Sequence, residues 1–357
     1  MSRFLSSRFQ KLEAYTPGEQ PQDMEYIKLN TNESPYPPSP EVFERIQAEE
    51  IGKLQLYPDP EGQVLREKLA KLYGVETENV FLSNGSDEIL HFAFLAFCEP
   101  KGTVRYPKVS YGFYSVYADL CGLSPKEIPL QEDFTINPAD YCNGNGMVVI
   151  ANPNAPTGLS LSLSQVEKII KQNPNDVVLI DEAYVDFGGT SAVGLTKKYE
   201  NLLMVQTFSK SRSMAGARLG FAIASKEIIA DLNRIKYSTN PYNINRLTLA
   251  AGEAAIDSND YYMENCKKII ETREKTAKKL KEMGFLVLDS KANFLFAMHN
   301  TVKGEKIYEG LKKKGVLVRY FGKETIEDFV RITIGTAEQM EVFLEKLQEL
   351  LLEEGNL

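Results

Sequence analysis

Short apolar segments alternate with helical segments through the middle of the chain, and this pattern limits the possible folds more than any other feature. The apolar segments are Val80–Leu82, Thr103–Tyr106, Met147–Ile150, Val177–Ile180, Leu202–Gln206 and Gly220–Ala224. Strands that alternate with helices favour an α/β fold, in which helices cover the faces of a mostly parallel sheet. Ligands of such folds bind beyond the carboxyl ends of the strands. The residues that follow each predicted strand are therefore the first candidates for a functional site.

The regions on either side of this pattern predict an arm and a second domain. The first 60 residues are rich in proline and turn formers, which favours an extended arm with one short helix near Glu41–Leu54. After about Asn245 the sequence predicts helices at 245–257, 260–283, 305–314 and the C-terminus, and strands at 286–288, 294–297, 316–319 and 329–334. We expect an N-terminal arm over residues 1–35 that joins the small domain, a large domain over 36–245, and a smaller α+β domain over 246–357.

A glycine-containing turn follows the first predicted strand. The segment Asn84-Gly85-Ser86-Asp87 leads from that strand into a helix over Glu88–Cys98. A glycine before a helix N-terminus leaves backbone N–H groups free to bind a phosphate. Ser86 and Asp87 are also common helix-capping residues, so this segment fits a plain cap as well as a phosphate site.

Two charged side chains end buried strands further along the chain. Asp181 follows the strand at 177–180, and a buried carboxylate is costly unless it meets a cation, such as a protonated pyridine nitrogen. Lys210 follows the strand at 202–206, where burial should lower the pKa of its amine. A neutral lysine amine is what Schiff-base chemistry requires. Together these positions favour a covalently bound aldehyde cofactor.

Two loops could complete such a site. Tyr111 follows the strand at 103–106, and its ring could stack on a planar cofactor or pack in the core. Asn154 lies in a turn that two prolines and Gly158 make rigid. Its amide could donate a hydrogen bond to a ligand oxygen, or the turn could be a plain loop.

Composition argues against several other classes of protein. The net charge of −8 and the sequence pI near 5.2 disfavour binding to nucleic acid. Two histidines and four scattered cysteines predict no metal site and no Ser-His-Asp triad, and they favour free thiols in a reducing compartment. No signal peptide is recognised, and no apolar run approaches the roughly 20 residues that a membrane span needs. We therefore expect a cytoplasmic protein that binds no membrane.

At these positions the chain resembles a known family. The motifs Asp181-Glu182-Ala183-Tyr184, Ser209-Lys210 with Arg218, and Pro156-Thr157-Gly158 resemble those of the fold-type I pyridoxal-phosphate-dependent aminotransferases. Three further motifs are similar to the histidinol-phosphate aminotransferase branch: Asn32-Glu33-Ser34-Pro35, Tyr57-Pro58-Asp59-Pro60-Glu61-Gly62 and Gly85-Ser86-Asp87-Glu88. The resemblance runs from Tyr15 to the C-terminal helix. The chain departs from it at Ala155, where many relatives have asparagine.

The resemblance implies pyridoxal 5'-phosphate as the cofactor and a role for each matching residue. Lys210 would carry the cofactor as a Schiff base and move the substrate proton, while Asp181 would pair with the pyridinium nitrogen. Tyr184 and Asn154 would hydrogen-bond the 3-oxygen of the ring, and Tyr111 would stack on the ring face. Lys210, Asp181 and Tyr184 are thus the expected catalytic residues. The implied phosphate ligands are Gly85, Ser86, Asp87, Thr207, Ser209, Arg218 and, from a second subunit of a homodimer, Tyr57.

The resemblance also implies a substrate-binding group and a reaction. Arg331 would bind the carboxylate of glutamate or the phosphate of histidinol phosphate, because a guanidinium binds both anions in a bidentate manner. Arg319, Tyr15 and Asn293 are similar to secondary substrate contacts, although Arg319 fits a solvated surface residue equally well. The implied reaction converts L-histidinol phosphate and 2-oxoglutarate to imidazole-acetol phosphate and L-glutamate, in histidine biosynthesis.

Other activities remain open at this point. An aromatic amino-acid aminotransferase or a phosphothreonine decarboxylase would share the same fold. A non-catalytic binding protein of this fold is less expected, because Lys210, Asp181 and Arg331 are all present and no helix-turn-helix segment precedes the arm. A Rossmann dehydrogenase is disfavoured, since no GxGxxG motif follows the first strand.

Overall fold

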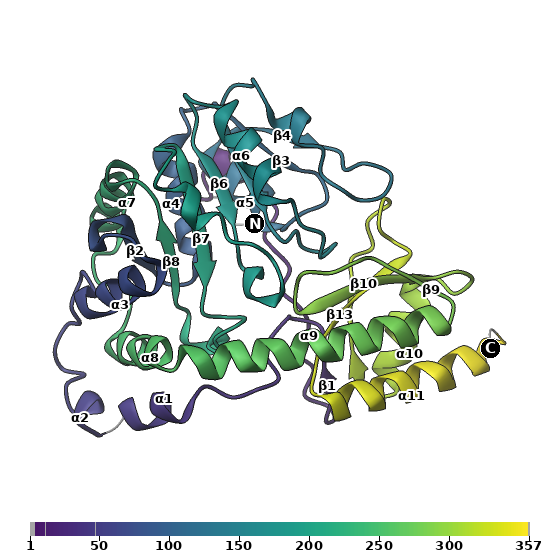
Figure 1. The fold of residues 1–357 in the computed structure, drawn as a ribbon. Helices are drawn as coiled ribbons and strands as arrows, with labels where there is room; N and C mark the ends of the chain where they lie inside the picture. Colours follow the sequence, from purple (N-terminus) through teal and green to yellow (C-terminus); the bar gives the residue numbers. More distant parts are fainter. Residues whose placement is uncertain (1–3, 11, 47, 356–357) are drawn as a thin grey trace.

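Seven strands form a central sheet in the order β2-β8-β7-β6-β5-β3-β4 (Figure 1). The computed structural model describes residues 4–10, 12–46 and 48–355. The strands are β2 (Val80–Ser83), β3 (Thr103–Pro107), β4 (Ser124–Ile128), β5 (Met147–Ala151), β6 (Val178–Asp181), β7 (Leu202–Thr207) and β8 (Gly220–Ile223). β8 runs antiparallel to both of its neighbours, whereas β4, β3, β5, β6 and β7 pair in parallel. The predicted α/β fold with a mostly parallel sheet is confirmed.

Except at the edge strand β4, both faces of the central sheet are buried, which explains the largely apolar character of its other strands. Along β5, Val149 packs toward one face while Val148 and Ile150 pack toward the other. The helices on the first face are α4 (Ser86–Phe97), α5 (Phe113–Cys121) and α7 (Lys226–Thr239), and the other face is covered by α6 (Leu163–Lys171). β4 was not predicted, because this edge strand is exposed at four of its five residues and lacks an apolar pattern.

A smaller antiparallel sheet forms the second part of the molecule. Its order is β12-β13-β10-β9, built from β9 (Phe285–Val287), β10 (Phe294–His299), β12 (Arg319–Tyr320) and β13 (Phe329–Thr333). The helices α10 (Gly304–Lys313) and α11 (Ala337–Glu353) share its hydrophobic core. The single strand predicted at 316–319 is wrong: Val316–Leu317 forms β11, which pairs in parallel with β1 (Ile27–Lys28), while β12 belongs to the antiparallel sheet.

The N-terminal segment contacts both parts. β1 and Leu29 join the core of the smaller part, while Tyr15 stacks on Phe113 of α5 with ring centroids 4.2 Å apart. The single helix predicted at 41–54 is also wrong, because the backbone of Ile46 leaves the helical region and separates α1 (Pro40–Arg45) from α2 (Ala48–Ile51).

The expected small domain begins at residue 246, with α8 (Arg246–Asp257). This helix packs on α1 and α3 (Gln63–Tyr73), beside the central sheet. α9 (Asn259–Glu282) then runs from the larger part to the smaller sheet (Figure 1). Short 3-10 helices occupy Ser7–Phe9, Thr77–Asn79, Pro138–Tyr141, Val185–Phe187, Ala192–Leu195 and Ala215–Ala217. Within the described ranges, every helix is too short or too polar to cross a membrane.

Candidate active site

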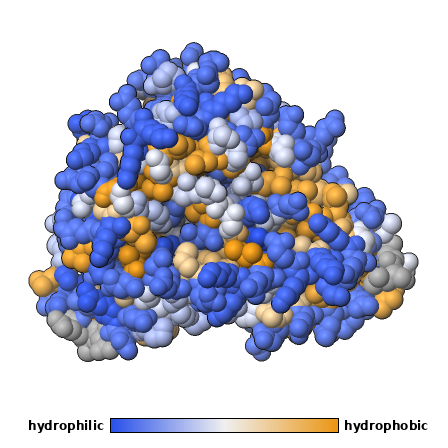
Figure 2. Space-filling model, in the orientation of Figure 1, coloured by the Kyte–Doolittle hydropathy of each residue, from blue (hydrophilic) through white to orange (hydrophobic). Residues whose placement is uncertain are grey.

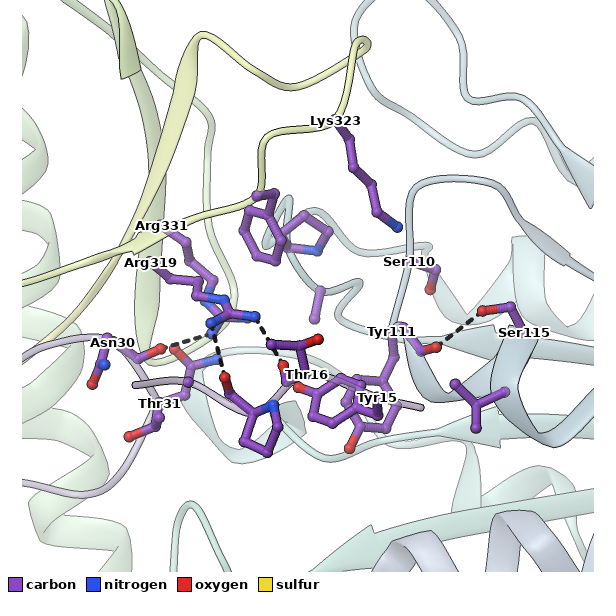
Figure 3. A pocket seen from close by; sticks show the side chains of 18 of the residues that line it. Tyr15, Thr16, Asn30, Thr31, Ser110, Tyr111, Ser115, Arg319, Lys323 and Arg331 are labelled. Carbon is purple, nitrogen blue, oxygen red and sulfur yellow. Dashed lines mark hydrogen bonds between the residues drawn. The ribbon is translucent and has the colours of Figure 1, made fainter. Parts of the chain in front are cut away.

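Two adjoining cavities lie where the strands of the central sheet end. The larger has a volume of about 640 Å³ and the smaller of about 320 Å³. They share a wall that includes Thr31, Tyr111, Ala155, Tyr184 and Lys210. The larger cavity lies between the arm, α5 and the β12–β13 side of the smaller sheet (Figure 3). On the face shown in Figure 2, hydrophobic residues gather in a band across the middle of the molecule, surrounded by hydrophilic ones.

The turn after β2 forms an anion-binding end of the smaller cavity. Gly85 precedes α4 with a φ of 76°, and no side chain caps this helix N-terminus. Ser86 and Asp87 line the cavity together with Arg218, whose Nη2 lies 3.0 Å from Asp87 Oδ2. L side chains rarely adopt this φ, and a Cβ at Gly85 would lie 2.6 Å from Arg218 Nη2, so a side chain here would strain the turn and displace the guanidinium. Free N–H groups and a guanidinium at one end of a cavity suit a phosphate.

Thr207 and Ser209 extend the same end of the smaller cavity. Both residues line it, and the Thr207 hydroxyl donates to Ser209 Oγ at 2.9 Å. The backbone N–H of Ser209 donates to Thr207 Oγ1 at 3.1 Å, which holds the two hydroxyls side by side. The structure therefore brings together Gly85, Ser86, Asp87, Thr207, Ser209 and Arg218, the residues predicted to hold a phosphate.

Asp181 lies at the buried end of β6 and lines the smaller cavity. Its side chain accepts hydrogen bonds from the Tyr114 hydroxyl at 2.8 Å and from the Ala183 N–H at 3.3 Å. Because the residue is only 4% exposed, burial raises the pKa of its carboxyl to about 6. Among the described residues, no cation forms an ion pair with it. A positively charged ligand atom in the cavity would compensate this buried charge.

Lys210 lies on the wall between the two cavities, where its Nζ donates to the backbone oxygen of Thr31 at 3.1 Å. Burial, and then the nearby charge of Arg331, lower the pKa of the Lys210 amine to about 8. A sizeable fraction of this amine is therefore neutral near physiological pH. A neutral amine is a nucleophile and a proton acceptor, as the sequence led us to expect.

Tyr184 and Tyr111 complete the wall around Lys210. The Tyr184 hydroxyl accepts a hydrogen bond from Asn32 Nδ2 at 3.0 Å, and the Tyr111 hydroxyl donates to Asp87 Oδ1 at 2.9 Å. Asn154, in contrast, lines neither cavity, because its Oδ1 accepts from Ser110 Oγ at 2.7 Å and its Nδ2 donates to the backbone of the same loop. The methyl group of Ala155 faces both cavities instead.

The larger cavity has a cationic side. Arg331 lies on β13, donates through Nη2 to the Asn30 oxygen at 3.1 Å, and holds its guanidinium over the ring of Phe294, 5.3 Å from the centroid. Arg319 lies beside it in Figure 3 and donates to the backbone oxygens of Thr16 and Pro17 at 3.1 and 3.3 Å. The buried Nε of Arg331 has no hydrogen-bond partner among the described residues, so this donor is available to an anion.

The remaining predicted residues fall in three different places. Tyr15 lines the larger cavity. Asn293 lines neither cavity and is fully buried behind them, where its Nδ2 donates to the Asn32 oxygen at 3.0 Å. Tyr57 lies outside both cavities; it is 77% exposed, and its ring stacks on Tyr242 with centroids 4.4 Å apart.

Three residues at the site had no assigned role from the sequence. Asn32 and Tyr114 bond to Tyr184 and Asp181, and Lys323 extends toward the larger cavity from the loop before β13 (Figure 3). Tyr114 belongs to a run of aromatic residues that is typical of a protein core, and Lys323 lies in a loop without a recognisable motif. Asn32 lies in a motif quoted for the resemblance, and this was the signal that could have identified it.

A lysine and a buried carboxylate at strand ends, next to an anion-binding turn, are features of the family whose profile fits this chain. The profile described as "Aminotransferase class I and II" matches residues 24–347, so the chain belongs to that family. The family-level resemblance predicted from the motifs is confirmed.

Close relatives carry a more specific name. The histidinol-phosphate aminotransferase of Brachyspira hyodysenteriae is 53% identical over 352 residues, which cover 98% of this chain and 99% of the relative. That of Clostridium acetobutylicum is 50% identical over 349 residues, which cover 98% of this chain and 99% of the relative. The crystal structure of the Sinorhizobium meliloti histidinol-phosphate aminotransferase in complex with pyridoxal-5'-phosphate has the same fold, with a TM-score of 0.86 at 22% identity, covering 99% of this chain and 100% of that one.

Proposed function

We propose that this chain is a histidinol-phosphate aminotransferase that uses pyridoxal 5'-phosphate to transfer an amino group between L-histidinol phosphate and 2-oxoglutarate. One observation carries the proposal: Lys210, Asp181 and the uncapped N-terminus of α4 line one cavity, which adjoins a second cavity that contains Arg331. The relatives that are 53% and 50% identical over nearly the whole chain support the same substrate.

The polar groups at the two ends of the smaller cavity match the polar groups of the cofactor. The N-terminus of α4, with Arg218, Thr207 and Ser209, would hold the phosphate. Asp181 has no ion-pair partner among the described residues, and it would hold the positive charge of the ring nitrogen. When bound, pyridoxal phosphate supplies an aldehyde for attachment to Lys210 and a ring that accepts electrons from the substrate α-carbon.

The protein's own groups then provide proton transfer and orientation. Because the pKa of Lys210 is lowered to about 8, its Nζ can both accept and release a proton near neutral pH. Tyr184 would donate its hydroxyl hydrogen to the 3-oxygen of the ring, and Tyr111 would lie against the ring face. The Asn154 amide is held by Val109 and Ser110 in the loop after β3, which supports Tyr184 as the principal donor to that oxygen.

The larger cavity would bind the substrate. Arg331 can bind a carboxylate or a phosphate through its planar guanidinium, and Arg319 beside it adds a second positive charge. Tyr15 would contact the substrate directly. Asn293 would act from behind the cavity, through the backbone of Asn32.

A homodimer is part of the proposal, with Tyr57 reaching the phosphate of the neighbouring subunit. Tyr57 lies outside the cavities of its own chain and is largely exposed, together with Phe43, Ile51, Leu54 and Leu56. An exposed apolar group of this kind favours a protein contact. A cytoplasmic location is also proposed, since all four cysteines are free thiols.

The test is a spectroscopic titration of the purified protein loaded with pyridoxal phosphate. A visible band of the lysine-bound cofactor that is lost on adding either glutamate or histidinol phosphate, and is absent in Lys210→Ala, is the expected result. Loss of the band with glutamate but not with histidinol phosphate would reject the substrate and retain the aminotransferase. No band in the wild-type protein would reject the cofactor site.

A further inference from the structure

Asn32 lies in the arm next to Tyr184 and lines the larger cavity but not the smaller one. The residue is 1% exposed, and its φ of 56° places it in the left-handed region, which asparagine tolerates better than most residues. Its Nδ2 donates to the Tyr184 hydroxyl oxygen at 3.0 Å. The proposed function assigns no role to this side chain.

Thr333 fixes the orientation of the Asn32 amide. Its hydroxyl oxygen accepts the backbone N–H of Asn32 at 3.0 Å, and its hydrogen is donated to Asn32 Oδ1, also at 3.0 Å. Since Oδ1 is thereby committed to Thr333, the NH2 group of the amide is the part that faces Tyr184. Thr333 is itself held in β13, the strand that carries Arg331.

This arrangement determines where the Tyr184 hydrogen points. An NH2 group can only donate, so the Tyr184 oxygen is the acceptor and its own hydrogen must be directed elsewhere. No acceptor for that hydrogen lies within bonding distance among residues 4–10, 12–46 and 48–355. Because Tyr184 lines both cavities, its O–H is left for a ligand.

The surrounding wall offers few alternatives to this donor. Ala151, Ala155 and Ala183 line the smaller cavity, and their side chains carry no hydrogen-bond donor. The amide of Asn154 is committed to Val109 and Ser110, in the loop after β3. A ligand oxygen at this wall therefore depends on the direction of the Tyr184 hydroxyl.

We infer that Asn32 is a positioning residue, which directs the Tyr184 hydroxyl hydrogen toward the 3-oxygen of pyridoxal phosphate. The inference rests on the proposed function, since it presupposes the cofactor in the smaller cavity. Asn32 acts on the cofactor through Tyr184, because it lines the larger cavity but not the smaller one that would hold the cofactor.

The experiment compares Asn32→Asp, Asn32→Ala and Tyr184→Phe by the pH midpoint of the visible band of the bound cofactor. Asn32→Asp keeps the shape of the side chain but replaces the donor with an acceptor, so the Tyr184 hydroxyl turns away from the cavity. Without the donated hydrogen, the 3-oxygen keeps more negative charge and the neighbouring lysine nitrogen holds its proton to higher pH. We expect Asn32→Asp and Tyr184→Phe to raise the midpoint by about one pH unit, because each removes a hydrogen bond to a charged oxygen. Asn32→Ala should raise the midpoint by less.

Two controls separate this role from general damage. Asn32→Ala added to Tyr184→Phe should leave the midpoint of Tyr184→Phe unchanged, because Asn32 acts only through the hydroxyl group that Tyr184→Phe removes. Asn30→Ala removes an equally buried amide from the same segment, one that donates to the Glu19 oxygen at 2.8 Å, and should keep the wild-type midpoint. Thermal unfolding of each variant checks that it is folded. If Asn32→Asp does not fold, Asn32→Ala and the double variant still decide the question.

Three outcomes would overturn the inference. In the first, Tyr184→Phe shifts the midpoint while the Asn32 variants do not. In the second, Asn32→Ala shifts it further in the Tyr184→Phe background. In the third, Asn30→Ala shifts it as much as Asn32→Ala. A wild-type protein with no visible band would instead overturn the proposed function, and this inference with it.

Discussion

The buried carboxylate of Asp181 should make the cofactor-free protein less stable at neutral pH than its neutral isostere Asp181→Asn. Burial raises the pKa of this carboxyl from 3.8 to about 6. The shift corresponds to a cost of about 3 kcal/mol for the ionised form at 1.36 kcal/mol per pKa unit. The side-chain amide of the variant has one oxygen in place of two, so it must give up one of the hydrogen bonds from Tyr114 and Ala183, which costs about 1 kcal/mol. We therefore expect Asp181→Asn to raise the free energy of unfolding by about 2 kcal/mol above about pH 7.

The pH dependence has a defined sign. Because the pKa is raised in the folded protein, the folded state binds the proton more tightly than the unfolded chain between about pH 4 and pH 6. The stability of the wild-type protein therefore falls through this window relative to that of Asp181→Asn. The variant should be about 1 kcal/mol less stable than the wild-type protein below about pH 4, where only its lost hydrogen bond counts, and about 2 kcal/mol more stable above about pH 6.

Urea unfolding of both cofactor-free proteins, at about pH 4 and about pH 8, measures this difference, and contributions from other groups cancel in the comparison. Pyridoxal phosphate should reverse the ranking, since its ring nitrogen gives Asp181 the missing cation and stabilises only the wild-type protein strongly. If the difference in the free energy of unfolding between the variant and the wild-type protein is the same at both pH values, or if the variant is not more stable at about pH 8, Asp181 is not a buried, uncompensated carboxylate.

Three further predictions concern the phosphate end, the substrate and the dimer. Gly85→Ala should raise the dissociation constant of pyridoxal phosphate at least about tenfold in a fluorescence titration, because the new Cβ would strain the turn and displace the Arg218 guanidinium; an unchanged constant would contradict this role of the turn. Arg331→Lys should raise the KM of both amino donors about tenfold with a smaller change in kcat, because a point charge replaces a bidentate group; a fall in kcat alone would argue against a binding role. Tyr57→Ala and Lys210→Ala should each give an inactive dimer. When the two dimers are dissociated and mixed, hybrid dimers with one intact site should restore up to about a quarter of wild-type activity. No recovery of activity would refute a site shared between subunits.

The sequence was sufficient for features that depend on local pattern. Asp181 and Lys210 follow strands buried on both faces, and the cost of burying a charge identified them before any contact was known. Gly85 was a candidate because a glycine before a helix leaves backbone N–H groups free, and the same segment also fitted a plain cap. These positions required only the strand pattern and the chemistry of single residues.

Other features depend on contacts between distant segments. The hydrogen bond of Asn32 to Tyr184 joins residues 152 positions apart, and nothing local to either residue predicts it. The antiparallel direction of β8 follows from its chain path rather than its composition, which resembles that of β7. Asn154 was assigned an available amide, but the packing of its loop against Ser110 uses that amide for structure.

The segment 30–32 meets the site largely through its main chain. The carbonyl oxygens of Asn30, Thr31 and Asn32 accept hydrogen bonds from Arg331, Lys210 and Asn293, respectively. Every amino acid has a carbonyl group, so most side-chain substitutions at positions 30 and 31 preserve these contacts. An alanine scan would consequently undervalue this segment. Deleting one residue from it would shift all of these carbonyls at once, and we expect insertions and deletions here to be far more harmful than substitutions.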